Sequence, residues 1–419
     1  MWSLFLLGFL AAAQATNRAT EVYHWQIVDV HWPSENAKSE AISANRYIAK
    51  NNVLAGIKVW KNQMFLTVPR WKAGVPVTLG VVPLTAVGNN TSPKLKAYPS
   101  WEMQEIGNCK AFQFVQSMEI DPYGRMWVLD TGRTEILTDE PVARCPPRLV
   151  VLDIEAGGKI LKVHEFPEHV TPRNASYLND LVLDSTEGGY VYISDASKED
   201  PGIIVYSLKS DASWKIRHST MQAAEEAVWF RVSAKRVKVE IPVDGIALSK
   251  LDDAERFVHY CPLASFELFA LPTSVLKKNE TDVDQYVQRL GRKPSQTDGM
   301  IVTADGRLYF GSLGDDTLMV WPSQPKTSTI TTDARIVVRD HSRLVWPDTF
   351  AIDEEGDLFL TANSLQDFID DEIDVHHYNS HIIKMNVGSK SYQYHQDGSL
   401  PEKMNVSMVD TKSSTAGEL

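Results

Sequence analysis

The chain has 419 residues, a formal net charge of −12 at pH 7 and 43% apolar residues. The excess of acidic residues argues against nucleic acids and anionic membrane surfaces as partners. No segment reaches about 18 consecutive apolar residues, so no membrane span is expected. A chain of this length usually folds as two or three domains, unless a ring of repeats buries each unit against its neighbours.

The N-terminus has the features of a secretory signal peptide, which we assign to residues 1–15. The apolar run Leu4–Ala13 is too short to span a bilayer, and Ala13-Gln14-Ala15 is a small-x-small cleavage pattern; the alternative is an uncleaved anchor. We therefore expect a secreted, extracellular protein. The candidate glycosylation sites are N-x-S/T sequons, of which the first two overlap: Asn89, Asn90, Asn174, Asn279 and Asn405.

One pattern recurs along residues 16–386: an apolar strand, a turn and a second apolar strand. It is clearest in Ser295–Trp321, and the copies begin at residues 56, 117, 180, 244, 298 and 348. Repeats of this length with several strands each are typical of propeller blades. The sequence therefore predicts an all-β, six-bladed β-propeller, with a β-sandwich as the alternative. The lone strand Val22–Val28 precedes the repeats, and we expect it to complete the last blade as a clasp.

Segments between the repeats predict additions to the ring. Met221–Val237 is predicted to be an inserted short helix and strand, and Ser274–Leu290 a surface helix or loop. Leu365–Ser380 is predicted to be a long acidic loop, and residues 387–419 a polar C-terminal tail. The acidic loop carries His376 and His377, but their spacing matches no known metal site, so no metal is predicted there.

Three cysteines occur in the chain. Cys109 and Cys145 flank the second repeat and are the expected disulfide, although three cysteines allow three pairings. Cys261 lies in an apolar strand pattern, where a buried thiol is expected.

The first strand of each propeller blade lines the channel, and four repeats place an acid at its start: Asp180, Asp244, Asp298 and Asp348. Ser117 and Gly56 take the other two places. Carboxylates converging on one channel mouth repel one another, which favours binding of Ca²⁺, a protonated amine or neutral donors. Asn179 and Asn363 add neutral oxygens. The alternative is that each acid caps a turn.

Aromatic residues are dense near these strand ends: Trp127, Tyr177, Tyr309, Trp346 and Phe350. Carboxylates beside aromatic faces suit an aromatic ligand with an ammonium group, through ion pairing and cation–π contact. The alternative is packing between blades. No nucleophile–base pair is identified, so no catalytic residue is assigned from the residues alone.

Six segments in order resemble the Yellow / major royal jelly protein family of insects. They include MWVLDTGR (126–133), YVYISDA (190–196) and WPDTFAIDEEGDLFLTAN (346–363), and the resemblance covers about residues 22–386. It implies a secreted six-bladed β-propeller. Members act in melanin pigmentation and in cuticle or eggshell hardening, convert dopachrome, bind biogenic amines or serve as royal jelly proteins.

The resemblance also carries individual positions. The family's amine-contacting Asn falls on Asn363, while a pocket Thr and a pocket Phe fall on Asp348 and Leu365, two departures from serotonin-type binding. Six-bladed lactonases, which hold a catalytic Ca²⁺, are a second resemblance through Asn179-Asp180. Their blade-one Glu has no counterpart near Gly56.

The resulting hypothesis is a protein that acts on or binds an indole- or catechol-derived molecule in pigmentation or in cuticle or eggshell hardening, with dopachrome conversion as the reaction. The alternative is a non-catalytic biogenic-amine binder or a structural component of an extracellular matrix. No cofactor is required by either, and Ca²⁺ is a candidate ligand of the acidic mouth.

Overall fold

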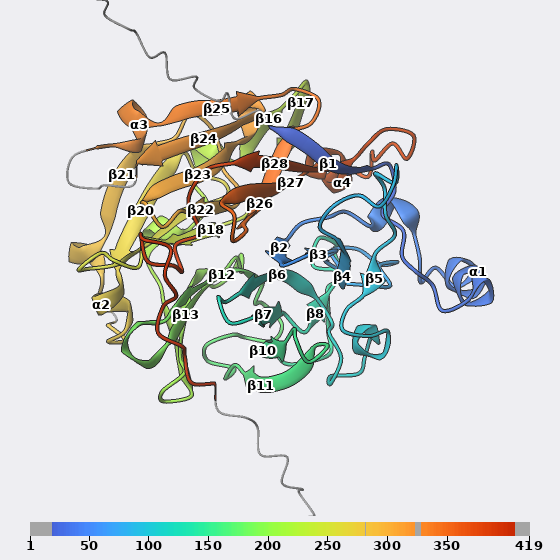
Figure 1. The fold of residues 1–419 in the computed structure, drawn as a ribbon, viewed down its shortest axis with the longest axis horizontal. Helices are drawn as coiled ribbons and strands as arrows, with labels where there is room; N and C mark the ends of the chain where they lie inside the picture. Colours follow the sequence, from blue (N-terminus) through green and yellow to red (C-terminus); the bar gives the residue numbers. More distant parts are fainter. Residues whose placement is uncertain (1–18, 281, 323–327, 407–419) are drawn as a thin grey trace, which may run out of the picture.

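The computed structural model describes residues 19–280, 282–322 and 328–406. The predicted signal peptide, residues 1–15, lies outside the described residues. Six four-stranded antiparallel sheets surround a central channel, so the predicted all-β, six-bladed propeller is confirmed (Figure 1). In sequence order the innermost strands contact one another around the ring, and the sixth contacts the first. No helix of the described residues is long and apolar enough to cross a membrane.

The strands of each blade are given from the channel outward. The first blade consists of β2 (Ile57–Trp60), β3 (Gln63–Thr67), β4 (Leu79–Pro83) and β5 (Lys96–Ala97), and the second of β6 (Val115–Ile120), β7 (Arg125–Asp130), β10 (Arg148–Asp153) and β11 (Lys159–Glu165). The third blade consists of β12 (Leu178–Asp184), β13 (Tyr190–Asp195), β14 (Gly202–Ser207) and β15 (Ala212–Ile216). The strands of the next two blades are β18 (Val243–Leu248), β19 (Phe257–Pro262), β20 (Glu267–Pro272) and β21 (Gln288–Arg292); and β22 (Met300–Val302), β23 (Arg307–Ser312), β24 (Thr317–Pro322) and β25 (Arg335–Arg339).

The sixth blade joins the two ends of the chain. Its strands are β26 (Trp346–Ile352), β27 (Asp357–Asn363), β28 (Ser380–Asn386) and, outermost, β1 (Thr20–Trp25). Because β1 pairs antiparallel with β28, the expected clasp by the N-terminal strand is confirmed. The clasp makes the ring a closed unit, in which every blade is covered on both faces.

Glycines follow two of the channel acids, at positions where neighbouring inner strands touch. A Cβ at Gly245 would lie 2.1 Å from the carbonyl oxygen of Asp298, and one at Gly299 would lie 2.3 Å from that of Asp348. The Gly299 N–H donates to the same Asp348 oxygen at 2.8 Å. The Asp-Gly pairs therefore allow close approach between blades at the acidic end of the channel.

The additions to the ring differ in part from the sequence-based predictions. Residues 221–237 contain 3₁₀ turns and a hairpin, β16 (Trp229–Val232) and β17 (Lys235–Lys238), in place of the predicted helix and strand. Residues 274–290 contain the short helix α2 (Thr273–Leu276) and enter β21, because the fourth blade needs an outer strand. The acidic segment begins with the helix α4 (Leu365–Ile369). The remaining elements are α1 (Glu35–Ser43), α3 (Ile330–Asp333), β8 (Arg133–Thr134) and β9 (Val142–Ala143).

The segment after β28 is described as far as residue 406 and is drawn in red in Figure 1. It contacts Thr303, Leu183 and Ile120 near the ends of inner strands, whereas the acids lie near the beginnings of such strands. Tyr392 is buried, and its hydroxyl accepts the N–H of Leu183 at 2.9 Å and lies 3.3 Å from Glu119. Arg125 donates to the carbonyl oxygen of Met404. The first twenty residues of the predicted polar tail are therefore packed against the propeller.

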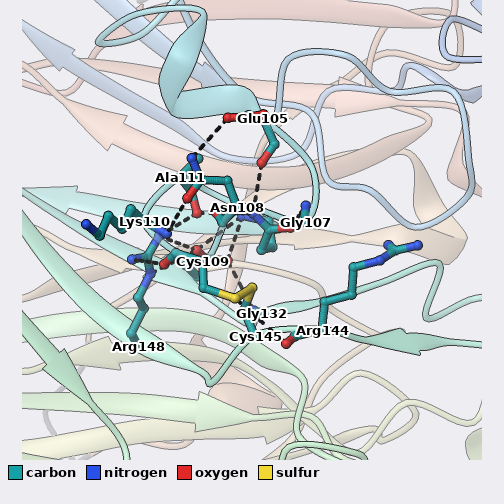
Figure 2. The surroundings of a disulfide bond; sticks show 12 residues. Glu105, Gly107, Asn108, Cys109, Lys110, Ala111, Gly132, Arg144, Cys145 and Arg148 are labelled. Atoms are coloured by element: carbon teal, nitrogen blue, oxygen red, sulfur yellow. Dashed lines mark hydrogen bonds and ion pairs between the residues drawn. A yellow bond between two sulfur atoms is a disulfide. The ribbon is translucent and has the colours of Figure 1, made fainter.

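Cys109 and Cys145 form a disulfide across 36 residues, which confirms the expected pairing (Figure 2). Arg148 supports it: the guanidinium donates to the carbonyl oxygens of Cys109 and Ala111 and pairs with Asp130. Cys261 is buried and free, as expected. The five sequon asparagines are exposed, and their glycosylation stays a prediction.

Candidate functional site

The four predicted acids lie at the same end of the channel, where their inner strands begin. All four are buried: Asp180, Asp244, Asp298 and Asp348 expose 9%, 3%, 8% and 2% of their surface. The inner strands place them there because each blade repeats the same strand–turn–strand unit in the same orientation. The geometry therefore brings together the residues that the sequence singled out, and their role in binding stays a proposal.

Asp244 and Asp298 form a hydrogen-bonded pair of carboxyl groups. Burial raises both pKa values well above the ordinary range, and the neighbouring charge of Asp348 raises them further. Two carboxyl groups in contact cannot both ionise cheaply, so ionisation of one disfavours ionisation of the other. The indole N–H of Trp346 donates to Asp298 at 2.7 Å, and the amide of Asn179 donates to Asp244 at 2.9 Å, which fixes both groups.

Asp348 stands beside this pair as a third carboxyl group. Burial raises its pKa to about 6, against hydrogen bonds from the Thr349 hydroxyl and the Asn363 amide that lower it. Asn363 also donates to the carbonyl oxygen of Leu54, and its own oxygen accepts the N–H of Leu365. The amide predicted to offer an oxygen to a ligand is thus engaged in orienting Asp348.

Asp180 is held apart from the pair by different partners. Its carboxylate accepts the Ser117 hydroxyl at 2.7 Å and the N–H of Leu181 at 2.8 Å. Burial raises its pKa, and the ammonium of Lys58 opposes that rise. Ser117 therefore donates a hydrogen bond to the acid of the next blade. This contact explains why the second repeat begins with a hydroxyl residue, where the other repeats begin with an acid or a glycine.

Two of the five predicted aromatics belong to this end. The Tyr177 hydroxyl accepts the indole N–H of Trp71 at 2.9 Å, and burial followed by the charge of Asp244 raises its pKa well above the ordinary value. Trp346 contacts Asp298 as described. The Tyr177 phenol therefore stays neutral beside the carboxyl groups.

For the other three aromatics the alternative, packing between blades, is confirmed. Trp127 packs between the second and third blades, while Tyr309 and Phe350 pack between the fifth and sixth. Trp127 and Tyr309 lie on second strands, β7 and β23, whose side chains fill the spaces between sheets and do not reach the channel.

A cluster of apolar side chains, here called the roof, covers the acids. It was not predicted from the sequence. Phe230 of the β16–β17 hairpin stacks on Trp346 with ring centroids 5.8 Å apart. Trp71, Leu313, Leu365 and Phe368 join the same cluster from distant parts of the chain. A ligand that reaches the acids from this end must therefore displace the roof.

Lys235 ties the hairpin to α4 and the loop that follows it. Its ammonium lies 3.4 Å from Asp367, 3.1 Å from Asp370 and 2.9 Å from Glu372. These contacts join the hairpin to the α4 segment, although Lys235 and Asp367 lie 132 residues apart in the sequence.

We expect Lys235→Ala to loosen the roof without unfolding the ring. Hydrogen exchange should speed up in β16, β17 and α4, while global stability falls by about 1 kcal/mol or less, as for other ion pairs near the surface. The matched control is Lys238→Ala on the same strand, whose ammonium pairs with Glu240. Equal exchange in both variants would contradict a latch at Lys235.

The described residues contain no group of three or more His, Cys, Asp or Glu side chains arranged to hold a metal ion. The channel carboxyl groups bond to Trp346, Asn179, Asn363 and Ser117, and to one another. These contacts engage part of the carboxylate oxygens that Ca²⁺ would need, and binding of Ca²⁺ at the acids stays a prediction.

Comparison with known proteins identifies the family. The family model described as major royal jelly protein matches residues 113–392. The chain belongs to the major royal jelly protein family. It is 27% identical over 400 residues to a dopaminechrome tautomerase of Drosophila melanogaster, covering 91% of this chain and 84% of that protein. It is 28% identical over 384 residues to Protein yellow of Drosophila yakuba, covering 88% and 69%.

Among solved structures, a luciferin-regenerating enzyme matches with a TM-score of 0.47 and 13% identity, covering 86% of this chain and 98% of the other. The major royal jelly protein match spans every proposed polar site residue, from Asn179 to Asn363. It ends at Tyr392, which is buried in the segment that crosses the opposite end of the channel.

Proposed function

We propose that this major royal jelly protein is secreted and catalyses the tautomerisation of an indole- or catechol-derived quinone at the acidic end of its channel. Pigment formation, or hardening of cuticle or eggshell, is the process it serves. The observation that carries the proposal is the contact between the buried carboxyl groups of Asp244 and Asp298, whose raised pKa values favour a state in which the pair shares one proton. The similarity to a dopaminechrome tautomerase supports the choice of reaction.

Such a tautomerisation moves two protons from ring carbons to the two ring oxygens and changes no oxidation state overall. It takes two successive steps, and in each of them one ring carbon loses a proton to a base while one ring oxygen gains a proton from an acid; after both steps the quinone has become a dihydroxyindole. In each step the ionised member of the pair takes the proton from carbon, and the protonated member gives its proton to oxygen. The two carboxyl groups exchange roles between the steps, so the pair ends the cycle with its single proton on the carboxyl group that held it at the start.

The remaining groups of the site fit a substrate with a positively charged ring nitrogen. Asp348, with a pKa of about 6, is mostly ionised at neutral pH and supplies the opposite charge. Trp346 and Tyr177 offer aromatic surface beside it. The apolar roof excludes water from the carboxyl groups, which keeps their pKa values high.

The second candidate is a non-catalytic binder of a biogenic amine or a structural component of an extracellular matrix. The roof favours it, because a cover latched by Lys235 and packed on Trp346 slows exchange of any bound molecule. In that case the three carboxyl groups neutralise an ammonium ion and transfer no proton.

The deciding experiment measures the decay of dopaminechrome and dopachrome absorbance with the purified, metal-stripped mature protein. We expect acceleration over both buffer and heat-denatured protein, with a dihydroxyindole as the product. Absence of acceleration, together with tight binding of an amine such as dopamine, would replace the enzyme by the binder. Absence of both would reject the two candidates.

A further inference from the structure

A cavity lies at the opposite end of the channel from the acids. It has a volume of about 750 Å³ and is formed where the inner strands β2, β6 and β26 end. The segment after β28 forms one side of it through Ser391, Gln393 and Tyr394. This volume lies within the range of sites for small organic molecules.

The floor of the cavity holds a buried cation. Lys58 exposes only 7% of its surface and donates to the carbonyl oxygen of Phe350 at 2.7 Å. Its ion pair with Glu119 is long, at 3.5 Å, whereas the other lysines of the lining, Lys61 and Lys384, pair at 2.7 and 2.6 Å with Glu155 and Asp357. Lys58 is therefore the most deeply buried lysine of the lining and the one with the longest ion pair, although its ammonium also faces Asp180.

The rim of the cavity carries the opposite charge. The β26–β27 turn contributes Asp353 and Glu355, and neither forms an ion pair with a cation of the described residues. Burial raises the pKa of Asp353, and its neighbours Asp357 and Glu355 raise it further. Crowded carboxylates of this kind are relieved by a bound cation.

Apolar and aromatic walls connect the floor to the rim. Trp60 and Tyr394 face the cavity together with Ile301 and Ala351. The Tyr394 hydroxyl is anchored on Glu354, and the Trp60 indole N–H on Glu155 at 2.6 Å, so both rings are held in place. A ligand that spans the cavity therefore needs three parts. They are an anionic group at the floor, an apolar body between the walls and a cationic group at the rim.

We propose that this cavity is a second ligand site, which binds a zwitterionic aromatic amino acid with its carboxylate on Lys58 and its ammonium on Asp353 and Glu355. The ring lies between Trp60 and Tyr394. None of the four channel acids lines this cavity. Lys58 nevertheless faces Asp180 as well, so variants at Asp298 and Glu355, which do not alter Lys58, separate this proposal from the proposed tautomerase activity.

The test is calorimetric titration of the full mature protein with L-phenylalanine, phenethylamine and 3-phenylpropionate. We expect one-to-one binding of L-phenylalanine, and binding about tenfold or more weaker for each analogue that lacks one charge. Equal affinity for all three compounds, or no binding of L-phenylalanine at millimolar concentration, would overturn the proposal.

Variants locate the site. Lys58→Met is combined with Glu119→Gln so that Glu119 is not left as a buried carboxylate without its ammonium partner, and the double variant should abolish the preference for L-phenylalanine over phenethylamine. Glu355→Gln should weaken the binding of both L-phenylalanine and phenethylamine, because both carry an ammonium group. Trp60→Ala removes one aromatic wall and leaves Lys58 and Glu119 unchanged, so it should weaken binding of all three compounds. Asp298→Asn, at the acidic end, should leave all three affinities unchanged. Loss of binding in Asp298→Asn alone would assign the ligand to the acids and overturn the second site.

Discussion

Replacing Asp298 by asparagine is expected to lower kcat for quinone tautomerisation by about a thousandfold, the typical contribution of a positioned acid or base. Asparagine has nearly the shape of aspartic acid and can still accept the indole N–H of Trp346, which lies 2.7 Å from the Asp298 carboxyl group. It cannot hold or release the proton that Asp298 shares with Asp244. KM should change little, because the apolar roof and Asp348 remain. The measurement is steady-state decay of dopaminechrome absorbance.

The control for this variant is Asp305→Asn in the turn of the same blade. Asp305 lies away from the acids and pairs with Arg307, so its replacement should leave kcat unchanged. An Asp298→Asn protein with activity within tenfold of the wild type would show that the carboxyl pair does not transfer the proton. Far-ultraviolet circular dichroism of both variants separates loss of chemistry from loss of fold.

The ring could be predicted from the sequence because its signals are local. A turn such as Ala304-Asp305-Gly306 between two apolar strands is visible without knowledge of what packs against it. The outer strand β11 was not predicted, because Lys159–Glu165 is a charged stretch of partly buried and exposed residues whose few apolar side chains form no long alternating pattern. The β16–β17 hairpin was missed for a similar reason, since only Phe230, Val232 and Val237 of it are buried and apolar.

The acids of the site could be predicted because they occupy equivalent positions in successive repeats. Their pairing could not, because the contact between Asp244 and Asp298 depends on how closely two blades approach. The roof could not be predicted either, since Trp71, Phe230 and Phe368 meet only in the folded chain. Lys58 and Glu119 carry no local signal that separates them from ordinary strand residues.

The burial of Asp348 makes the stability of the folded chain depend on pH. Its carboxyl group has a pKa of about 6 in the folded chain, against 3.8 as the ordinary value. Between these two values the folded state holds a proton that the unfolded state has released, so stability falls as pH rises through this window. Above about pH 6 both states are ionised, and the cost levels off at about 3 kcal/mol.

Asp348→Asn removes this cost, so we expect the variant to be more stable than the wild type at pH 7.5 and little changed at pH 4. The gain should be somewhat below 3 kcal/mol, because the amide replaces one of the acceptors used by Thr349 and Asn363, worth about 1 kcal/mol. Guanidinium unfolding at the two pH values measures the difference, and Asp139→Asn, an exposed replacement of the same kind, is the control.

A variant that is less stable at pH 7.5 would mean that the hydrogen bonds of the ionised Asp348 outweigh its burial. A variant that gains stability and loses turnover would show that the fold tolerates an unfavourable buried charge because the site needs it. Proteins commonly accept such a cost where a strained or desolvated group performs the function. The joint outcome therefore tests whether the carboxyl groups are present for chemistry or for the architecture of the ring.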